Sequence, residues 1–247
     1  MTVSPDGALP TIPEGDSVLV VMAHPDDAEF GCGGTIARWA AAGKVINYVL
    51  CTSGDKGAGD PAVSPLELAR TRRREQIDAA HALGAREVTF LGYSDGVLQN
   101  TLELRRDIVR QIRRYRPAAV VCQDPTQRWG GTGYLNHPDH RAAGDACLDA
   151  VYPSARDPLV FPELLLEDLE PHKVQEVFMS SQTHADVWID VGECMDKKLE
   201  ALRQHVSQVG DRLEGFEERI RERSRAAARA AERPFEYAEG YKYFRLG

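Results

Sequence analysis

The chain has 247 residues, a length that suits one large α/β domain or two small domains. With 43% hydrophobic and 28% charged residues it has the composition of a soluble globular protein, and no apolar run is long enough to span a membrane. The formal net charge of −8 argues against nucleic acid as a partner, because phosphate binding needs a basic surface.

Residues 1–16 are rich in proline, glycine and acidic residues, and they lack the basic stretch and apolar core of a signal peptide. We expect residues 1–16 to form a loose arm and residues 17–247 to form a single α/β domain. The five cysteines are scattered and form no Cys-x-x-Cys pair, which favours free thiols in a reducing compartment. We therefore expect a cytoplasmic protein.

Apolar segments of strand length alternate with helical patterns from Ser17 onward. Residues 17–23 form a continuous apolar run, which is typical of a strand buried on both faces. Residues 24–34 contain Pro25 and three glycines and predict a loop. The next expected elements are a helix over 35–42, a strand over 45–51, a helix over 65–83, a strand over 88–91, a helix over 102–115 and a strand over 118–122. The helix over 65–83 is expected to place its apolar residues on one side: Leu66, Ala69, Ile77, Ala80 and Leu83.

The pattern is less regular after Asp149. There we expect strands over 177–181 and 187–190, a helix over 195–206, a long charged helix over 213–232 and a last strand over 237–245. Interleaved Arg and Glu residues in the long helix predict a solvated face. The alternation of strand and helix in the first half predicts an α/β fold, with an open, mostly parallel sheet, helices on both faces and a less regular C-terminal third.

Four polar residues directly follow predicted strands: His24, Ser53, Asp95 and Asp124. Ligands of open α/β sheets bind beyond the carboxyl ends of the strands. We therefore expect these side chains to meet at one rim of the sheet.

The densest polar cluster is His24-Pro25-Asp26-Asp27. Histidine and carboxylate are the usual zinc ligands besides cysteine, and a His and an Asp three apart on a tight loop can both turn toward one ion. Asp26 must then point elsewhere, which leaves its carboxylate free for proton transfer. An isolated His-x-x-Asp is more often an incidental loop pair, so this cluster alone does not establish a metal site.

A second cluster, residues 136–140, follows the fourth predicted strand and opens a helix. His137 and His140 lie three apart on one side of its first turn, so one can complete a metal site while the other stays nearby. Asp139 can orient a ligand histidine or cap the helix, and the sequence does not decide between these roles. Two such clusters at the strand ends of one sheet favour a metal site.

These clusters carry a family resemblance. Ala-His-Pro-Asp-Asp-Ala-Glu-Phe-Gly-Cys-Gly-Gly-Thr at 23–35 and Asn-His-Pro-Asp-His-Arg at 136–141 resemble the LmbE-like, or PIG-L, family of zinc-dependent N-acetylglucosaminyl deacetylases, which includes enzymes of mycothiol and bacillithiol biosynthesis. The resemblance covers roughly residues 18–208 and implies a Rossmann-like fold.

The resemblance also implies a role for each residue of the two clusters. One zinc ion per chain would be held by His24, Asp27 and His140. Asp26 would be the general base, and a protonated His137 would stabilise the charged intermediate. The implied reaction is hydrolysis of an N-acyl amide, usually N-acetyl, on a glucosamine-type sugar or its glycoside, with zinc-bound water as the nucleophile.

The family pattern extends to three more segments. Arg72 opens a matching Arg-x-x-Glu helix and would be expected to reach the sugar, with a surface arginine as the alternative. Asp95 resembles the family's sugar-hydroxyl-binding Asp, with a turn-forming Asp-Gly as the alternative. Residues 205–208 match the family's His-x-Ser-Gln, to which we assign no role. We expect Glu29 to be a solvated loop acid, with a role at the rim of the site as the alternative. Trp129, Tyr134 and Trp188 could stack on a sugar or belong to the core.

Other functions fit parts of the sequence. Gly31-Cys32-Gly33-Gly34 is similar to a dinucleotide-binding loop but departs from the Gly-x-Gly-x-x-Gly spacing. Two histidines and a carboxylate also describe the iron site of non-haem oxygenases, which usually lies on an all-β barrel. The sequence leaves two further alternatives open: a non-catalytic zinc-containing sugar-binding protein and a deacylase that acts on a non-acetyl amide. The expected partner is an amino-sugar substrate, and assembly into homo-oligomers stays open too.

Overall fold

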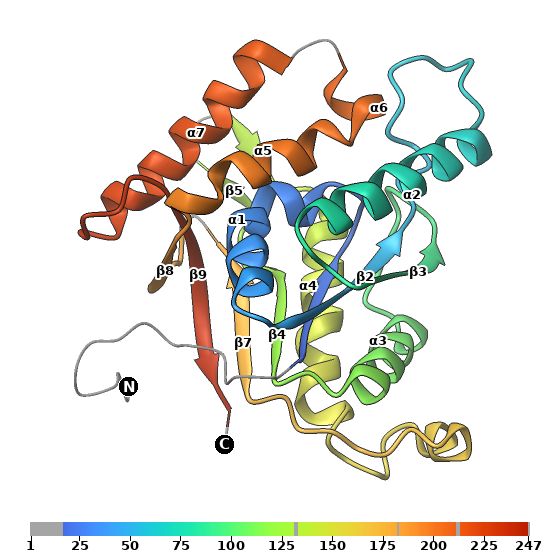
Figure 1. The fold of residues 1–247 in the computed structure, drawn as a ribbon. Coiled ribbons are helices and arrows are strands. Elements are labelled where there is room, and N and C mark those ends of the chain that lie inside the picture. The colour runs from blue at the N-terminus through green and yellow to red at the C-terminus, as the bar shows by residue number, and fades with distance from the viewer. Residues whose placement is uncertain (1–16, 131–132, 182, 211–212, 247) are drawn as a thin grey trace.

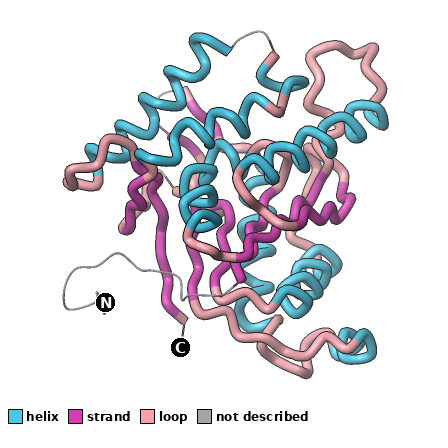
Figure 2. Tube along the Cα trace, in the orientation of Figure 1, coloured by secondary structure: helices cyan, strands magenta, loops and turns pink. Residues whose placement is uncertain are grey.

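The computed structural model describes residues 17–130, 133–181, 183–210 and 213–246. A seven-stranded sheet forms its centre, in the order β3-β2-β1-β4-β7-β9-β8 (Figures 1 and 2). Its strands are β1 (Ser17–Met22), β2 (Val45–Thr52), β3 (Glu87–Tyr93), β4 (Ala119–Gln123), β7 (Glu176–Ser180), β8 (Val187–Asp190) and β9 (Ala238–Arg245). The strands from β3 to β7 in this order pair in parallel, whereas β9 is antiparallel to both of its neighbours. The predicted open, mostly parallel sheet is confirmed.

Helices pack against both faces of this sheet, as predicted (Figure 1). They are α1 (Asp27–Ala41), α2 (Pro65–Ala82), α3 (Leu102–Tyr115), α4 (Pro138–Asp149), α5 (Met195–Arg203), α6 (Val206–Val209) and α7 (Leu213–Ala230). Shorter elements are η1 (Ala150–Ser154), η2 (Pro162–Glu167), η3 (Gly192–Cys194) and a small hairpin of β5 (Trp129–Gly130) and β6 (Tyr134–Leu135). One hydrophobic core lies between the sheet and α1, α2 and α5, and a second lies between the sheet and α3 and α4.

Strand β1 contributes to both cores. Val18, Val20 and Met22 pack on the α1 side, whereas Leu19 and Val21 pack on the α3 side. All five side chains are buried. Because alternate side chains of a strand point to opposite faces, a strand covered on both faces has a continuous apolar sequence, which is why β1 could be predicted.

The glycine-rich segment after β1 is largely helical, so the predicted loop over 24–34 is wrong for most of its length. Helix α1 begins at Asp27 and bends at Cys32, whose φ is −146°. A Cβ atom added to Gly34 would lie 2.6 Å from the Cβ of Val191. This glycine therefore permits close packing of α1 against the segment that follows β8.

A buried ion pair holds the bend of α1. Glu239 of β9 accepts hydrogen bonds from the backbone amides of Gly34 at 2.9 Å and Thr35 at 2.8 Å. Lys198 of α5 donates to the Phe30 carbonyl at 3.0 Å, and its Nζ lies 2.6 Å from Glu239 Oε1. The amides at the bend are thus bound to a carboxylate and are not available to a phosphate, which argues against the dinucleotide-binding alternative.

Two predicted helices differ from the structure. The helix expected over 195–206 is two helices, because the chain turns at His205 between α5 and α6. On α2, Leu66 is 61% exposed, whereas Arg72 and Gln76 are buried. The predicted apolar side of α2 is therefore partly wrong, because part of its buried face consists of polar residues that point toward the rim of the sheet.

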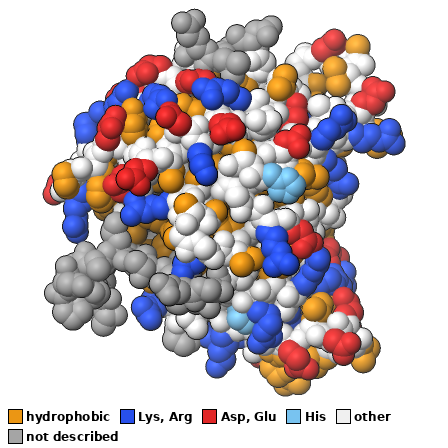
Figure 3. All heavy atoms as spheres, in the orientation of Figure 1, with side chains coloured by type: hydrophobic (Ala, Val, Ile, Leu, Met, Phe, Trp, Pro, Cys, Tyr) orange, Lys and Arg blue, Asp and Glu red, His pale blue; other side chains and the backbone are white. Residues whose placement is uncertain are grey.

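On the face drawn in Figure 3, acidic and basic side chains are interspersed over α7. Arg225, for example, pairs with Glu218 and Glu222, as its interleaved sequence predicts.

None of the described helices is long and apolar enough to cross a membrane. The expected arm over residues 1–16 lies outside the described residues, and the division into an arm and one domain stays a prediction.

Candidate active site

A pocket of about 900 Å³ opens at the carboxyl ends of β1 to β4. All the residues that the sequence singles out for the site line it: His24, Asp26, Asp27, Arg72, Asp95, His137 and His140. They come from the β1–α1 junction, from α2, from the loop after β3 and from the start of α4. The prediction that one rim of the sheet collects the polar residues is correct for His24, Asp95 and Asp124, which line the pocket. Ser53 does not line it and accepts a hydrogen bond from Arg73 Nε at 2.8 Å.

His24 lies among three carboxylates. Its Nδ1 is 3.3 Å from Asp27 Oδ2, and its Nε2 is 3.1 Å from Asp95 Oδ1 and 3.2 Å from Asp139 Oδ2. Burial alone would lower the pKa of His24, but hydrogen bonds with Asp139, Asp27 and Asp95 raise it to about 12. The three carboxylates around His24 therefore favour a cation at this position.

Asp27 joins the two predicted clusters. Its Oδ1 lies 3.1 Å from His140 Nε2, and its Oδ2 accepts hydrogen bonds from the His24 amide at 2.8 Å and from Gln123 Nε2 at 3.0 Å. Burial would raise the pKa of Asp27, but the charge and hydrogen bond of His140 and the hydrogen bond of His24 hold it well below its usual range. His140 is itself oriented by Asn136, whose Oδ1 lies 2.9 Å from the His140 Nδ1 atom.

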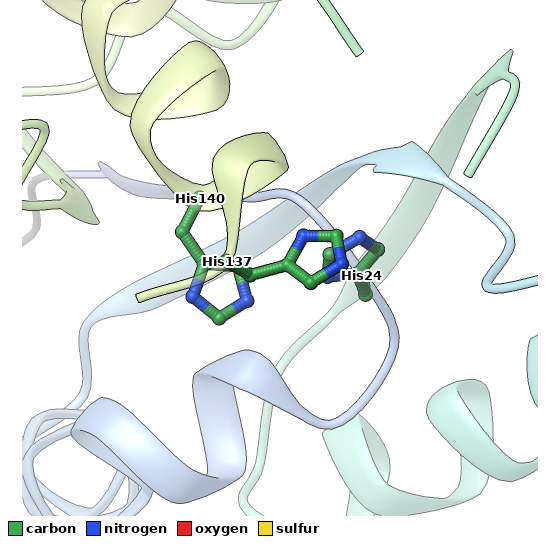
Figure 4. A group of neighbouring side chains, drawn as sticks. All are labelled: His24, His137 and His140. Atoms are coloured by element: carbon green, nitrogen blue, oxygen red, sulfur yellow. The ribbon is translucent and has the colours of Figure 1, made fainter. Parts of the chain in front are cut away.

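The donor atoms fit a metal ion of the zinc type. Imidazole nitrogen and carboxylate oxygen are its usual ligands, and donors about 2.1 Å from a tetrahedral ion lie roughly 3.4 Å apart. The His24–Asp27 and Asp27–His140 contacts are close to this separation. Nitrogen atoms of His24, His137 and His140 lie within 4.8 Å of one another, and the three rings lie close together (Figure 4). A second group that could hold an ion is formed by His24, Asp95 and Asp139.

The side chain of Asp26 contacts Arg72 rather than the residues of this cluster. The Asp26 φ of 84° is left-handed, and the Asp26 amide donates to Gln76 Oε1 at 2.8 Å. Arg72 Nη2 donates to Asp26 Oδ2 at 3.2 Å and to the Pro25 carbonyl at 2.8 Å. Burial and the negative charge of Asp27 raise the pKa of Asp26 to about 7, although Arg72 acts in the opposite direction. This carboxyl group lines the pocket beside the metal-type cluster and is suited to exchanging a proton near neutral pH.

His137 caps helix α4 at the mouth of the pocket. Its Nδ1 accepts a hydrogen bond from the Asp139 amide at 3.2 Å, so that nitrogen carries no proton and Nε2 is the donor of a neutral ring. Burial lowers the pKa of His137, and the nearby His24 lowers it further. The geometry therefore favours a neutral His137, in contrast to the protonated form expected from the sequence.

Arg72 contacts Asp26, and Asp95 contacts His24 of the cluster. The Arg72 guanidinium group is bound to Asp26 and to the carbonyls of Pro25 and Gly54, and the side chain lines the pocket but is otherwise buried, which excludes the alternative of a surface arginine. Asp95 faces His24 and accepts a hydrogen bond from the Lys56 amide at 3.0 Å. Contact of either side chain with a sugar stays a prediction.

The structure decides between roles that the sequence left open for other residues near the pocket. Asp139 is buried, contacts His24 and accepts hydrogen bonds from the amides of Gly96 at 2.7 Å and Leu98 at 3.1 Å, so it orients a ligand-type histidine. Glu29 is fully buried, and the expectation of a solvated loop acid is wrong. The Trp129 and Tyr134 side chains are exposed on the β5–β6 hairpin, so neither belongs to the core.

Comparison with known proteins agrees with this site. The family model described as "GlcNAc-PI de-N-acetylase" (PIG-L) matches residues 19–151. Diacetylchitobiose deacetylase of Thermococcus kodakarensis is 37% identical over 77% of this chain and 69% of its own length. A probable N-acetyl-alpha-D-glucosaminyl L-malate deacetylase 2 of Bacillus anthracis is 30% identical over 79% of this chain and 83% of its own length.

A solved structure has the same fold. It is N,N'-diacetylchitobiose deacetylase from Pyrococcus horikoshii, with a TM-score of 0.85 and 29% identity over 94% of this chain and 85% of that chain. The motifs, the sheet with its rim of histidines and carboxylates, and these relatives agree. The chain belongs to the PIG-L family, the LmbE-like family of de-N-acetylases.

Proposed function

We propose that the protein hydrolyses the N-acetyl amide of a glucosamine-type sugar or its glycoside, with zinc held by His24, Asp27 and His140. The observation that carries this proposal is the position of the Asp26 carboxyl group, which lines the same pocket as the three proposed ligands but is held apart from them by Arg72. A sugar-binding protein has no need of such a group. Membership of a family of deacetylases supports the same reaction.

A zinc ion, when bound, supplies Lewis acidity, which polarises a carbonyl group and makes water a stronger acid. Asp26 accepts the proton of the water molecule that attacks the amide carbon, and it returns the proton to the nitrogen as the carbon–nitrogen bond breaks. His137 donates its Nε2 proton in a hydrogen bond to the carbonyl oxygen as negative charge develops there. Asp139 and Asp95 accept hydrogen bonds from His24 and fix the orientation of its ring.

The substrate class follows from the relatives and from the size of the pocket. A volume of about 900 Å³ is large enough for a sugar that carries a second group. The relatives named above are a diacetylchitobiose deacetylase and a probable N-acetyl-alpha-D-glucosaminyl L-malate deacetylase. We therefore expect a glycoside of N-acetylglucosamine to be the substrate, with Arg72, Asp95 and the exposed Tyr134 near it. A cytoplasmic location and one zinc ion per chain are further expectations.

Release of free amine tests the reaction. Protein stripped of metal by a chelator and protein reloaded with zinc would each be incubated with N-acetylglucosamine, N,N'-diacetylchitobiose and N-acetylglucosaminyl malate. We expect amine release from at least one glycoside by the zinc-loaded protein alone. Bound zinc with no amine release from any of these acetyl amides would contradict the proposed reaction and favour a sugar-binding role or a deacylase acting on a different acyl group.

A further inference from the structure

The His-x-Ser-Gln segment, residues 205–208, lies against the wall of the pocket that carries Asp26. His205 is fully buried at the turn between α5 and α6, and its Nε2 lies 3.2 Å from Glu29 Oε2. Its Nδ1 has no hydrogen-bond partner among the residues that the structure describes. A carboxylate such as Glu29 can only accept, so His205 Nε2 is the donor in this contact.

Glu29 in turn fixes the orientation of Gln76. The side-chain amide of Gln76 donates from Nε2 to Glu29 Oε1 at 3.0 Å. Since the NH₂ group faces the carboxylate, the other end of the amide, Oε1, is turned toward the backbone amide of Asp26, which donates to it at 2.8 Å. Both Glu29 and Gln76 are fully buried, so neither contact is exchanged with bulk water.

This chain of hydrogen bonds ends at a residue with an unfavourable backbone conformation. Asp26 has a φ of 84°, and a non-glycine residue persists there only when its surroundings hold it. Gln76 holds the amide of Asp26, and Arg72 holds the preceding carbonyl of Pro25. The left-handed turn is what separates the Asp26 carboxyl group from Asp27.

Ser207 attaches the segment to the helix that carries Gln76. Its amide donates to Glu75 Oε1 at 2.8 Å, and its hydroxyl donates to Glu75 Oε2 at 2.6 Å. Residues 205 and 207 therefore contact α1 and α2 at the same time. The segment connects the two helices at the level of Asp26.

We propose that His205, Glu29 and Gln76 are positioning residues, which hold Asp26 in its left-handed conformation with its carboxyl group in the pocket. This inference rests on the proposed role of Asp26 as proton acceptor. It gives the His-x-Ser-Gln segment a function in the reaction without contact with substrate. The Glu29 carboxyl group orients the amide of Gln76, and His205 holds Glu29 in place.

The first test needs no substrate. Hydrogen–deuterium exchange would be followed in the peptide over residues 22–31 of the zinc-loaded protein, for wild type, Gln76→Met, His205→Ala and His205→Gln. We expect faster exchange in this peptide for Gln76→Met and His205→Ala, with partial rescue in His205→Gln, which keeps an N–H donor. The matched control is His172→Ala, which removes a ring bonded to the Pro117 carbonyl in another part of the fold. Unchanged exchange in Gln76→Met and His205→Ala would overturn the proposal.

The second test uses kinetics and separates positioning from general destabilisation. In an otherwise wild-type chain, His205→Ala and Gln76→Met should lower kcat by at least ~10-fold with little change in KM, because a misplaced proton acceptor acts on the chemical step. In the Asp26→Ala background the same substitutions should have no further effect on the residual rate. An equal loss in both backgrounds would contradict the proposal, whereas a fully active Asp26→Ala would contradict the proposed function instead. If His205→Ala does not fold, Gln76→Met carries both tests.

Discussion

Asp26 and Asp27 are neighbours in the chain, yet their carboxyl groups face different partners: Asp27 lies between His24 and His140, whereas Asp26 lies 3.2 Å from Arg72 Nη2. The left-handed backbone of Asp26 turns the two side chains apart. Consecutive acidic residues thereby serve two purposes, because one belongs to the metal-type cluster and the other remains available for proton transfer.

His140 and His137 offer a matched pair for identifying the metal ligands. Replacement of His140 by alanine should lower zinc content well below that of wild type, because the ring faces Asp27. His137→Ala should keep its zinc, because the His137 Nδ1 atom is used as a helix cap. Zinc per chain, measured by elemental analysis after gel filtration, compares the two. Loss of zinc from His137→Ala and its retention in His140→Ala would reverse the assignment.

His137→Ala should also lose most of its turnover. Removing one hydrogen-bond donor to a developing oxyanion typically costs about 3–4 kcal/mol of barrier, so kcat should fall roughly 10²- to 10³-fold. The measurement is the rate of amine release at saturating substrate by zinc-loaded protein. Wild-type kcat in this variant would remove His137 from the mechanism.

Lys198→Met should destabilise the fold. It leaves Glu239 buried without its cation, a change that typically costs about 3–5 kcal/mol of unfolding free energy. The double variant Lys198→Met with Glu239→Leu removes both charges and should recover part of this loss. Urea denaturation of the three proteins measures the difference. If Lys198→Met is as stable as wild type, the ion pair of Lys198 and Glu239 does not hold the bend of α1.

The same pair should make stability depend on pH. Burial would raise the pKa of Glu239, but Lys198 and hydrogen bonds with Thr35 and its amide hold it below its usual value. Tyr241 OH, 3.2 Å from Glu239 Oε2, also faces this carboxylate. Because the folded pKa is lower than the unfolded one, the stabilisation is present above the unfolded pKa of about 4.3 and is lost as pH falls through the folded pKa.

The stability difference between wild type and Glu239→Gln should therefore be larger at pH 7 than at pH 3. Urea denaturation at both pH values gives the two differences in unfolding free energy. If the difference in unfolding free energy between wild type and Glu239→Gln is the same at pH 7 and pH 3, ionisation of Glu239 contributes nothing to stability.

The sheet could be predicted because buried parallel strands such as β1 have continuous apolar sequences. The convergence of His24, Asp27 and His140 in one pocket followed from the rule that ligands bind beyond the strand ends. The beginning of α1 could not be predicted in the same way. Its glycines disfavour a helix locally, and the contacts that compensate come from Val191 and Glu239, far away in the chain.

The surroundings of the site were also hidden in the sequence. Glu29 reads as a loop acid, but it is buried because α2 and the turn before α6 supply Gln76 and His205 as partners. In the sequence Arg72 is one of several arginines on a helix that could be exposed, yet its guanidinium group donates a hydrogen bond to Asp26. Each of these contacts joins segments that only the folded chain brings together.

Comparison of Asp26→Asn with wild type tests the central claim most directly. Zinc content and amine release from N,N'-diacetylchitobiose would be measured on the same preparations. We predict similar zinc content in both proteins, with a rate at least ~100-fold lower in the variant, because the substituted amide cannot accept the proton. Undiminished amine release by zinc-loaded Asp26→Asn would contradict the account.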